Sequence, residues 1–184
     1  KFQNLVQKDT TLFTSQKAKK ETENYVLFVD AFRYELAQEF CERLTKLKYK
    51  IKLENSWSAI PSLTPTAKPN VAPIATMVAT NSQITEFRPQ LETGKDLQTN
   101  EFRKALKEAN FNHIVKATDI NPDKNSWEEI GDIDTKGHEE QADMVGSIEK
   151  LFGQVQESLD NAFEKGVKKI KIVTDHGWLL LPGG

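Results

Sequence analysis

The chain has 184 residues, of which 28% are charged and 38% hydrophobic, and its formal net charge is −2. This composition is typical of one globular domain with a substantial core. It gives no strong nucleic-acid footprint, and with no apolar run of roughly 18 residues we predict no membrane span. The only cysteine, Cys41, excludes a disulfide within the chain and is predicted to be a small core residue.

The first elements along the chain predict a strand–helix–strand unit. Residues 1–24 are polar and are interpreted as a linker or peripheral segment. The apolar run Tyr25–Val29 is typical of a strand buried on both faces. Apolar residues then recur at helical spacing through Arg33–Leu47, and Tyr49–Leu53 alternates as a second strand would.

The middle of the chain is predicted to be more irregular. A proline-bounded loop at residues 59–65 leads into a helix over 70–80. Residues 81–100 are polar and are interpreted as an exposed insertion or lid. A short helix over 101–109 and a strand over 113–116 follow.

The last third returns to regular elements. After a loop at residues 118–127 comes a weak strand candidate at 129–133, and then a long helix over 139–165 that Gly166 ends. Alternating Lys and Ile/Val predict a strand over 169–174. Strands alternating with helices predict an α/β fold with a mostly parallel central sheet and helices on both faces.

Polar residues that suit metal chemistry stand at the predicted strand ends. They are Asp30; Thr64 in Pro-Ser-Leu-Thr; Asp134 and His138 in Asp-Thr-Lys-Gly-His; and Asp175 and His176 in Asp-His-Gly. Ligands collect at the carboxyl ends of strands in open α/β sheets, and Asp and His bind divalent cations such as zinc. A threonine beside them is a candidate nucleophile. The pattern predicts metal-assisted phosphoryl or phosphodiester chemistry.

Each candidate ligand has a structural alternative. Asp30 could cap the following helix. Asp134 could cap the long helix that His138 opens, and Asp132 competes with Asp134 as a ligand. Asp175 and His176 could form an ordinary surface turn.

The residues predicted to act on phosphate also have alternatives. Thr64 could cap a helix, and Thr66 is nearly as good a nucleophile candidate. Arg33 and Lys68 could help to hold phosphate or could be solvated. His113 is interpreted as structural.

Taken in order, the four motifs resemble those of the alkaline phosphatase superfamily. The stretches Val-Asp-Ala-Phe-Arg-Tyr-Glu, Pro-Ser-Leu-Thr-Pro-Thr-Ala-Lys-Pro and Val-Thr-Asp-His-Gly-Trp are most similar to a PglZ domain, which occurs in bacterial phage-resistance (BREX-type) proteins. The resemblance covers residues 25–182. It implies an alkaline-phosphatase-like sandwich over residues 25–184, and we interpret the chain as truncated at the C-terminal side of that domain.

The resemblance also implies two divalent metal ions, zinc or alternatively manganese. Asp30, Thr64, Asp175 and His176 would hold one ion, and Asp134 and His138 the other. The family has a further histidine ligand on the second ion, downstream of the Asp-His-Gly motif and beyond Gly184. On this interpretation the fragment alone is expected to be inactive.

The function that the resemblance implies is that of a cytoplasmic, metal-dependent phosphodiesterase or phosphatase. It would hydrolyse a phosphate ester, nucleotide or oligonucleotide through the Thr64 hydroxyl and would work with other phage-defence proteins. The alternatives are a non-catalytic metal-binding scaffold of a defence complex and a phosphomutase-like activity.

Overall fold

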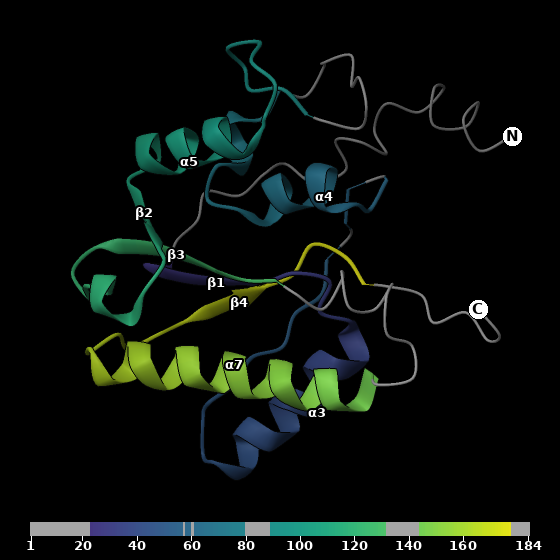
Figure 1. Ribbon diagram of the computed structural model, residues 1–184, viewed down its shortest axis with the longest axis vertical. Helices are drawn as coiled ribbons and strands as arrows, with labels where there is room; N and C mark the ends of the chain where they lie inside the picture. Colours follow the sequence, from purple (N-terminus) through teal and green to yellow (C-terminus); the bar gives the residue numbers. More distant parts are fainter. Residues whose placement is uncertain (1–22, 57, 60, 80–88, 132–143, 178–184) are drawn as a thin grey trace, which may run out of the picture.

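The computed structural model describes residues 23–56, 58–59, 61–79, 89–131 and 144–177, and it shows an α/β architecture around one parallel sheet (Figure 1). The strands are β1 (Tyr25–Val29), β2 (Phe111–Ile114), β3 (Asn125–Ile130) and β4 (Lys171–Val173). Within the described residues their order is β2-β3-β1-β4, and every neighbouring pair is parallel. The predicted α/β class with a mostly parallel sheet is confirmed.

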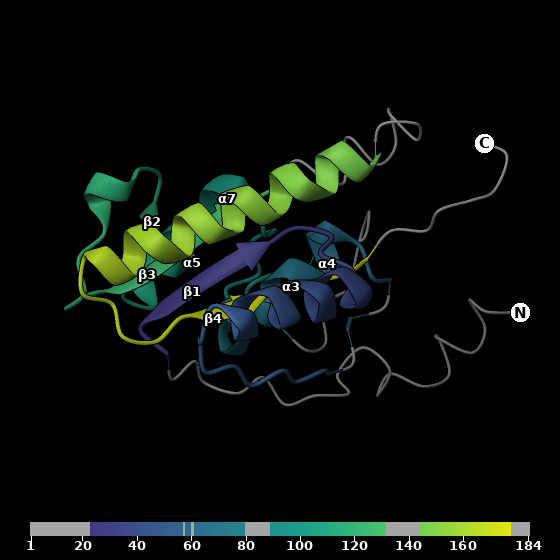
Figure 2. The same ribbon diagram turned by 90° about the horizontal axis from the view of Figure 1, so that it is seen from below.

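Helices cover both faces of the sheet, as predicted (Figures 1 and 2). The helices are α3 (Tyr34–Lys46), α4 (Thr64–Val71), α5 (Thr99–Glu108) and α7 (Met144–Glu164), with short 3₁₀ turns η1 (Ala75–Met77) and η2 (Ala117–Asp119). Helices α4 and α5 lie on one face, and α3 and α7 lie on the other. Within the described residues, no helix combines the length and the apolar character that crossing a membrane requires.

Strand β1 divides the core in two because its side chains alternate between the faces. Val26 and Phe28 pack with Trp127 of β3 and with the side of α5 that faces the sheet. Leu27 and Val29 pack against α3 and α7. All five residues of β1 are buried, which explains why its sequence is a continuous apolar run.

The strand predicted at Tyr49–Leu53 is wrong. The structure has no strand there, and Ile51 and Leu53 are 37% and 44% exposed. Both edges of β1 are occupied by β3 and β4, so the alternating segment has no partner on the central strand. A pattern of period two alone does not supply the hydrogen bonds of a sheet.

The helix predicted over 70–80 begins and ends earlier than expected. Pro65 suits the first turn of α4 because a first-turn amide needs no partner within the helix. Pro73 lacks an amide proton and favours an extended backbone at Ala72, whose ψ is 158°. The helix therefore ends at Val71, and the turn η1 follows.

Strand β3 includes part of the predicted loop 118–127 and only the start of the strand candidate 129–133. Its apolar pattern is interrupted by Glu128 and Glu129, and each carboxylate has its own partners. Tyr25 donates a 2.7 Å hydrogen bond to Glu128, and Ser158 of α7 donates another of 2.9 Å. Burial and the hydrogen bond to Glu128 raise the pKa of Tyr25 above its usual range.

The remaining predictions divide into confirmed elements and residues outside the described set. The predicted helices over 33–47 and 101–109 correspond to α3 and α5, and the predicted strands over 113–116 and 169–174 correspond to β2 and β4. Gly166 follows the end of α7 with φ of +93°, where glycine is favoured. Residues 1–22, 80–88 and 139–143 belong to predicted segments that lie outside the described residues.

Candidate metal centre

Asp30 lies directly beyond the carboxyl end of β1. Its amide donates to the carbonyl of Ile130 at 2.9 Å, which extends the pairing with β3 by one residue. Ala31 then adopts a left-handed conformation with φ of +52°, uncommon for alanine, and turns the chain sharply. Helix α3 begins only at Tyr34, with Arg33 as N-cap and no side-chain cap. Asp30 therefore does not cap α3.

Asp175 and His176 lie beyond the end of β4, next to this turn. The amide of Phe32 donates to the hydroxyl of Thr174 at 3.0 Å, and that hydroxyl donates to the carbonyl of His176 at 3.2 Å. Ser58 donates to the carbonyl of Asp175 at 2.6 Å. These bonds join the β1–α3 turn to the loop after β4, so the Asp-His-Gly motif is fixed in place and is not an ordinary surface turn.

The three side chains converge. One ligand atom from each of Asp30, Asp175 and His176 lies within 4.8 Å of the others. Nδ1 of His176 is 2.9 Å from Oδ1 of Asp175 and 3.9 Å from Oδ1 of Asp30. The predicted clustering of these residues at strand ends is confirmed, and the two strands are neighbours in the sheet.

The arrangement suits a divalent cation. Asp175 is 3% exposed, and its buried Oδ2 has no hydrogen-bond partner among the described residues. A buried carboxylate oxygen without a donor is costly, and a second carboxylate within 4.8 Å adds repulsion that a cation would offset. Two carboxylates and one imidazole form a donor set that zinc and manganese both accept.

Thr64 lies beside this group, as the sequence predicts. Its hydroxyl donates to Oδ1 of Asp30 at 3.4 Å, and Thr64 is the first residue of α4. The N-cap is Leu63, so Thr64 is not the cap. Thr66, the alternative nucleophile, is only 5% exposed. This burial and the contact of Thr64 with Asp30 favour Thr64.

The start of α4 offers phosphate less than a helix N-terminus usually does. Pro65 has no amide proton, and the amides of Thr66 and Ala67 both donate to the carbonyl of Leu63. Side chains and any bound cation would therefore supply most of the attraction for phosphate.

The predicted phosphate-binding residues have carboxylate partners. Arg33 bonds to Glu35 at 3.2–3.3 Å and lies against Gly177, next to the candidate ligands. Lys68 forms an ion pair with Glu129 at 2.7 Å. Phosphate binding by either residue stays a prediction. The ligands predicted for a second ion, Asp134 and His138, lie outside the described residues, as does Asp132.

Family models, curated proteins and solved structures were compared with the chain. No comparison found a match. The functional interpretation therefore depends on the motifs and on the geometry of the site.

The sequence alone assigned no role to two glycines that lie beside the centre. A Cβ atom on Gly131 would lie 3.2 Å from Cβ of Asp30, and one on Gly177 would lie 3.2 Å from Cγ of Arg33. Gly131 comes directly after β3, so it packs beside the end of β1. The position of Gly131 at a strand end was a signal in the sequence, but its contact with Asp30 could not be inferred without the strand order.

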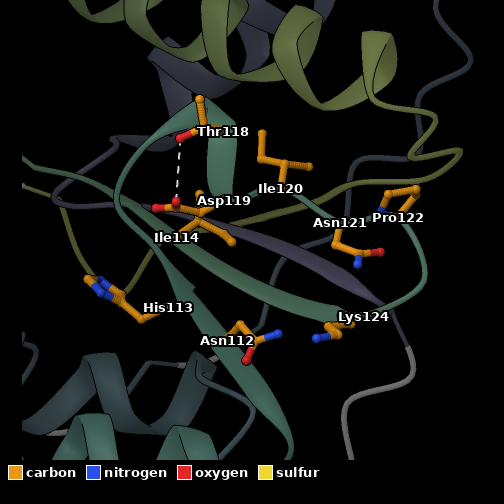
Figure 3. A pocket seen from close by; sticks show the side chains of 9 residues that line it. All are labelled: Asn112, His113, Ile114, Thr118, Asp119, Ile120, Asn121, Pro122 and Lys124. Atoms are coloured by element: carbon orange, nitrogen blue, oxygen red, sulfur yellow. Dashed lines mark hydrogen bonds between the residues drawn. The ribbon is translucent and has the colours of Figure 1, made fainter.

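An open hollow lies apart from this centre, along the edge strand β2 (Figure 3). Its volume is about 660 Å³, and it is lined by β2 and the segment that joins β2 to β3. Thr118 donates to Asp119 there at 3.4 Å, and His113 and Lys124 also line it. None of the predicted catalytic or metal-binding residues lines this hollow. We therefore place the candidate function at Asp30, Asp175 and His176.

Replacing Gly131 by alanine should weaken metal binding. The new methyl group would press on Asp30 and shift its carboxylate, and changes next to metal ligands commonly cost about 10-fold in affinity or more. Calorimetric titration with Zn²⁺ measures this. The matched control is Gly153→Ala in α7, where a Cβ meets nothing within 4 Å. It should leave affinity unchanged and stabilise the fold by about 0.5–1 kcal/mol. Equal affinities of the two variants would contradict the role of Gly131.

Proposed function

We propose that this chain is a metal-dependent phosphoric ester hydrolase domain of the alkaline phosphatase superfamily, most similar to the PglZ domain. One observation carries the proposal. Two carboxylates and an imidazole from two strand ends meet within 4.8 Å, and a threonine hydroxyl from a third element donates a hydrogen bond to one of the carboxylates. An α/β sheet with a nucleophile beside a cation site is suited to displacement at phosphorus.

Asp30, Asp175 and His176 would hold the cation, and Thr64 lies close enough to join them. When bound, a divalent cation supplies positive charge for the phosphate oxygens and makes a nearby hydroxyl more acidic. The backbone and side-chain hydrogen bonds from Phe32, Thr174 and Ser58 keep the β4 loop in place, so the ligands are held before the ion arrives.

The reaction follows from the position of Thr64. Its Oγ1 would attack phosphorus, forming a phosphothreonine ester while the bond from phosphorus to the leaving oxygen breaks. Asp30, which accepts from the Thr64 hydroxyl, would orient it, and the hydroxyl proton would pass to water while the leaving oxygen takes a proton from water. Water would then hydrolyse the phosphothreonine, which releases phosphate, or a monoester from a diester, and restores the hydroxyl.

The test is hydrolysis of bis-p-nitrophenyl phosphate by the full-length natural protein loaded with Zn²⁺ or Mn²⁺. We expect p-nitrophenol release that EDTA removes and added metal restores. Acid quenching during turnover should trap a phosphoryl adduct on Thr64, visible by mass spectrometry. Tight metal binding without hydrolysis would overturn the proposal in favour of a metal-binding scaffold. Isomerisation of a sugar phosphate without net release of phosphate would favour a phosphomutase.

The wider setting remains part of the proposal. By the same resemblance, the substrate is a phosphate ester, nucleotide or oligonucleotide, the partners are other phage-defence proteins, and the compartment is the cytoplasm. A second ion, held by Asp134 and His138, belongs to the proposal as well. The net charge of −2 predicts no bulk electrostatic attraction to an oligonucleotide, so its recognition would depend on local contacts.

A further inference from the structure

Lys68 is held in an unusual position for a lysine. Its side chain is only 20% exposed, and its ammonium group lies 2.7 Å from Oε2 of Glu129. The same group lies over two aromatic rings, 4.8 Å from the centre of Phe28 and 5.0 Å from that of Phe102. A cation between two ring faces and a carboxylate is restrained on several sides.

Glu129 is restrained as well. Trp127 donates to its Oε1 at 2.7 Å, and Nε2 of His113 lies 4.0 Å from the same oxygen. Burial alone would raise the pKa of Glu129, but Lys68, with smaller help from Trp127 and His113, holds it below the usual value. The ion pair is therefore charged at neutral pH and is lost only below the usual pKa of a glutamate.

The geometry of α4 connects this ion pair to Thr64. Residues four apart lie on one face of a helix, and residues two apart lie on one face of a strand. Thr64 and Lys68 therefore share a face of α4, just as Phe28 and Asp30 share a face at the end of β1. Thr64 contacts Asp30, and one turn later Lys68 contacts Phe28. The helix is thus attached to the sheet at two points along one line.

We propose that Lys68 and Glu129 are positioning residues, whose ion pair fixes α4 on the sheet and thereby keeps the Thr64 hydroxyl on Asp30. The catalytic part of this inference rests on the proposed function. It gives Lys68 a role other than the phosphate binding that its sequence position suggests. A lysine held by Glu129 and two rings acts on the helix that carries the nucleophile.

The two roles of Lys68 predict different kinetics. A displaced nucleophile lowers kcat, whereas a lost phosphate ligand raises KM and weakens inhibition by inorganic phosphate. A substitution of Glu129 also distinguishes the two roles of Lys68. If the ion pair positions α4, Glu129→Gln should be as harmful as Lys68→Met. If Lys68 binds phosphate, Glu129→Gln frees the lysine and should leave phosphate binding intact or stronger.

The experiment compares Lys68→Met, Glu129→Gln, their double variant and Lys68→Arg in the full-length protein with Zn²⁺. Methionine keeps the apolar stem between the rings, and glutamine keeps the shape of Glu129. We expect each single variant to lower kcat by roughly 10- to 100-fold with KM and the phosphate inhibition constant within about 2-fold. The double variant should be no worse than either single one, and Lys68→Arg should recover most of the activity.

The experiment has a control variant and a second readout, hydrogen exchange, which does not depend on activity. Lys104→Met removes a similar lysine–glutamate pair, with Glu101, on the exposed side of α5 and should change nothing. Hydrogen exchange at the amide of Ala67 reports on α4 directly, and it should become roughly 10-fold faster in both single variants. Faster exchange supports the fixing of α4 even if the wild-type protein hydrolyses nothing, which would overturn only the proposed function. Unchanged exchange, or a raised KM in Lys68→Met alone, overturns the inference.

Discussion

Replacing Thr64 by alanine should abolish phosphodiester hydrolysis while leaving the fold and most metal binding intact. Thr64 would supply the attacking oxygen, so its loss removes the covalent route, which typically costs orders of magnitude in rate. The hydroxyl contributes only a neutral contact to the metal site, 3.4 Å from Asp30. Metal affinity should therefore fall far less than activity. Hydrolysis of bis-p-nitrophenyl phosphate by the full-length protein measures the first effect, and Zn²⁺ titration measures the second.

Thr66→Ala is the matched control for Thr64. Thr66 is a buried threonine two residues later on the same helix, and losing its hydroxyl should cost little activity. If Thr66→Ala is inactive and Thr64→Ala is active, the nucleophile is misassigned by two residues but the reaction class holds. If both variants hydrolyse the diester at the wild-type rate with metal bound, a covalent mechanism through this helix is wrong.

Asp175→Asn should produce the largest loss of metal binding. The substitution keeps the shape and the Oδ1 acceptor for the amide of His176 but removes the buried negative charge. It also puts an NH₂ group, which cannot bind a cation, where Oδ2 now lies. We expect Zn²⁺ affinity to fall by about 100-fold or more, because a carboxylate binds the ion as an anion and the side-chain amide of asparagine carries no charge.

Stability measurements separate this effect from misfolding. Metal at about 100 times the wild-type Kd should stabilise the wild-type protein by about 2.7 kcal/mol, and this gain should fall to about 0.4 kcal/mol or less in Asp175→Asn. Without metal, the variant should be at least as stable as the wild type, because one of two neighbouring carboxylate charges is gone. Asp160→Asn on the exposed side of α7 should keep the full metal-dependent gain. A metal-free variant that is strongly destabilised would contradict the proposed electrostatics.

The sequence predicted those elements of the fold that are determined by residues close together in the chain. The apolar run of β1, the helical spacing in α3 and α5, and the glycine after α7 each determine their element without help from distant residues. The convergence of Asp30 with Asp175 and His176 was also predictable, because parallel strands place their carboxyl ends at one edge.

The errors concern properties that only the assembled sheet decides. The segment Tyr49–Leu53 has strand-like alternation but no free edge beside β1. Strand β3 looked weak because its two glutamates interrupt the apolar pattern, although Tyr25 and Lys68 are their partners from other elements. Gly131 could be connected to Asp30 only once β3 was known to lie between β2 and β1.

The strand order also has a consequence for how the chain folds. Of the described strands, β1 is made first, but both of its neighbours come late, since β3 begins at Asn125 and β4 at Lys171. At ribosomal rates of about 5–20 residues per second, the apolar strand waits on the order of 5–20 s for roughly 100 residues to be made before β3 can pair with it. During that time its unpaired edges are open to other chains, and contacts so distant in sequence also form slowly. The metal site, which needs the residues after β4, would therefore be among the last features to form, and metal would bind the finished fold rather than guide its early steps.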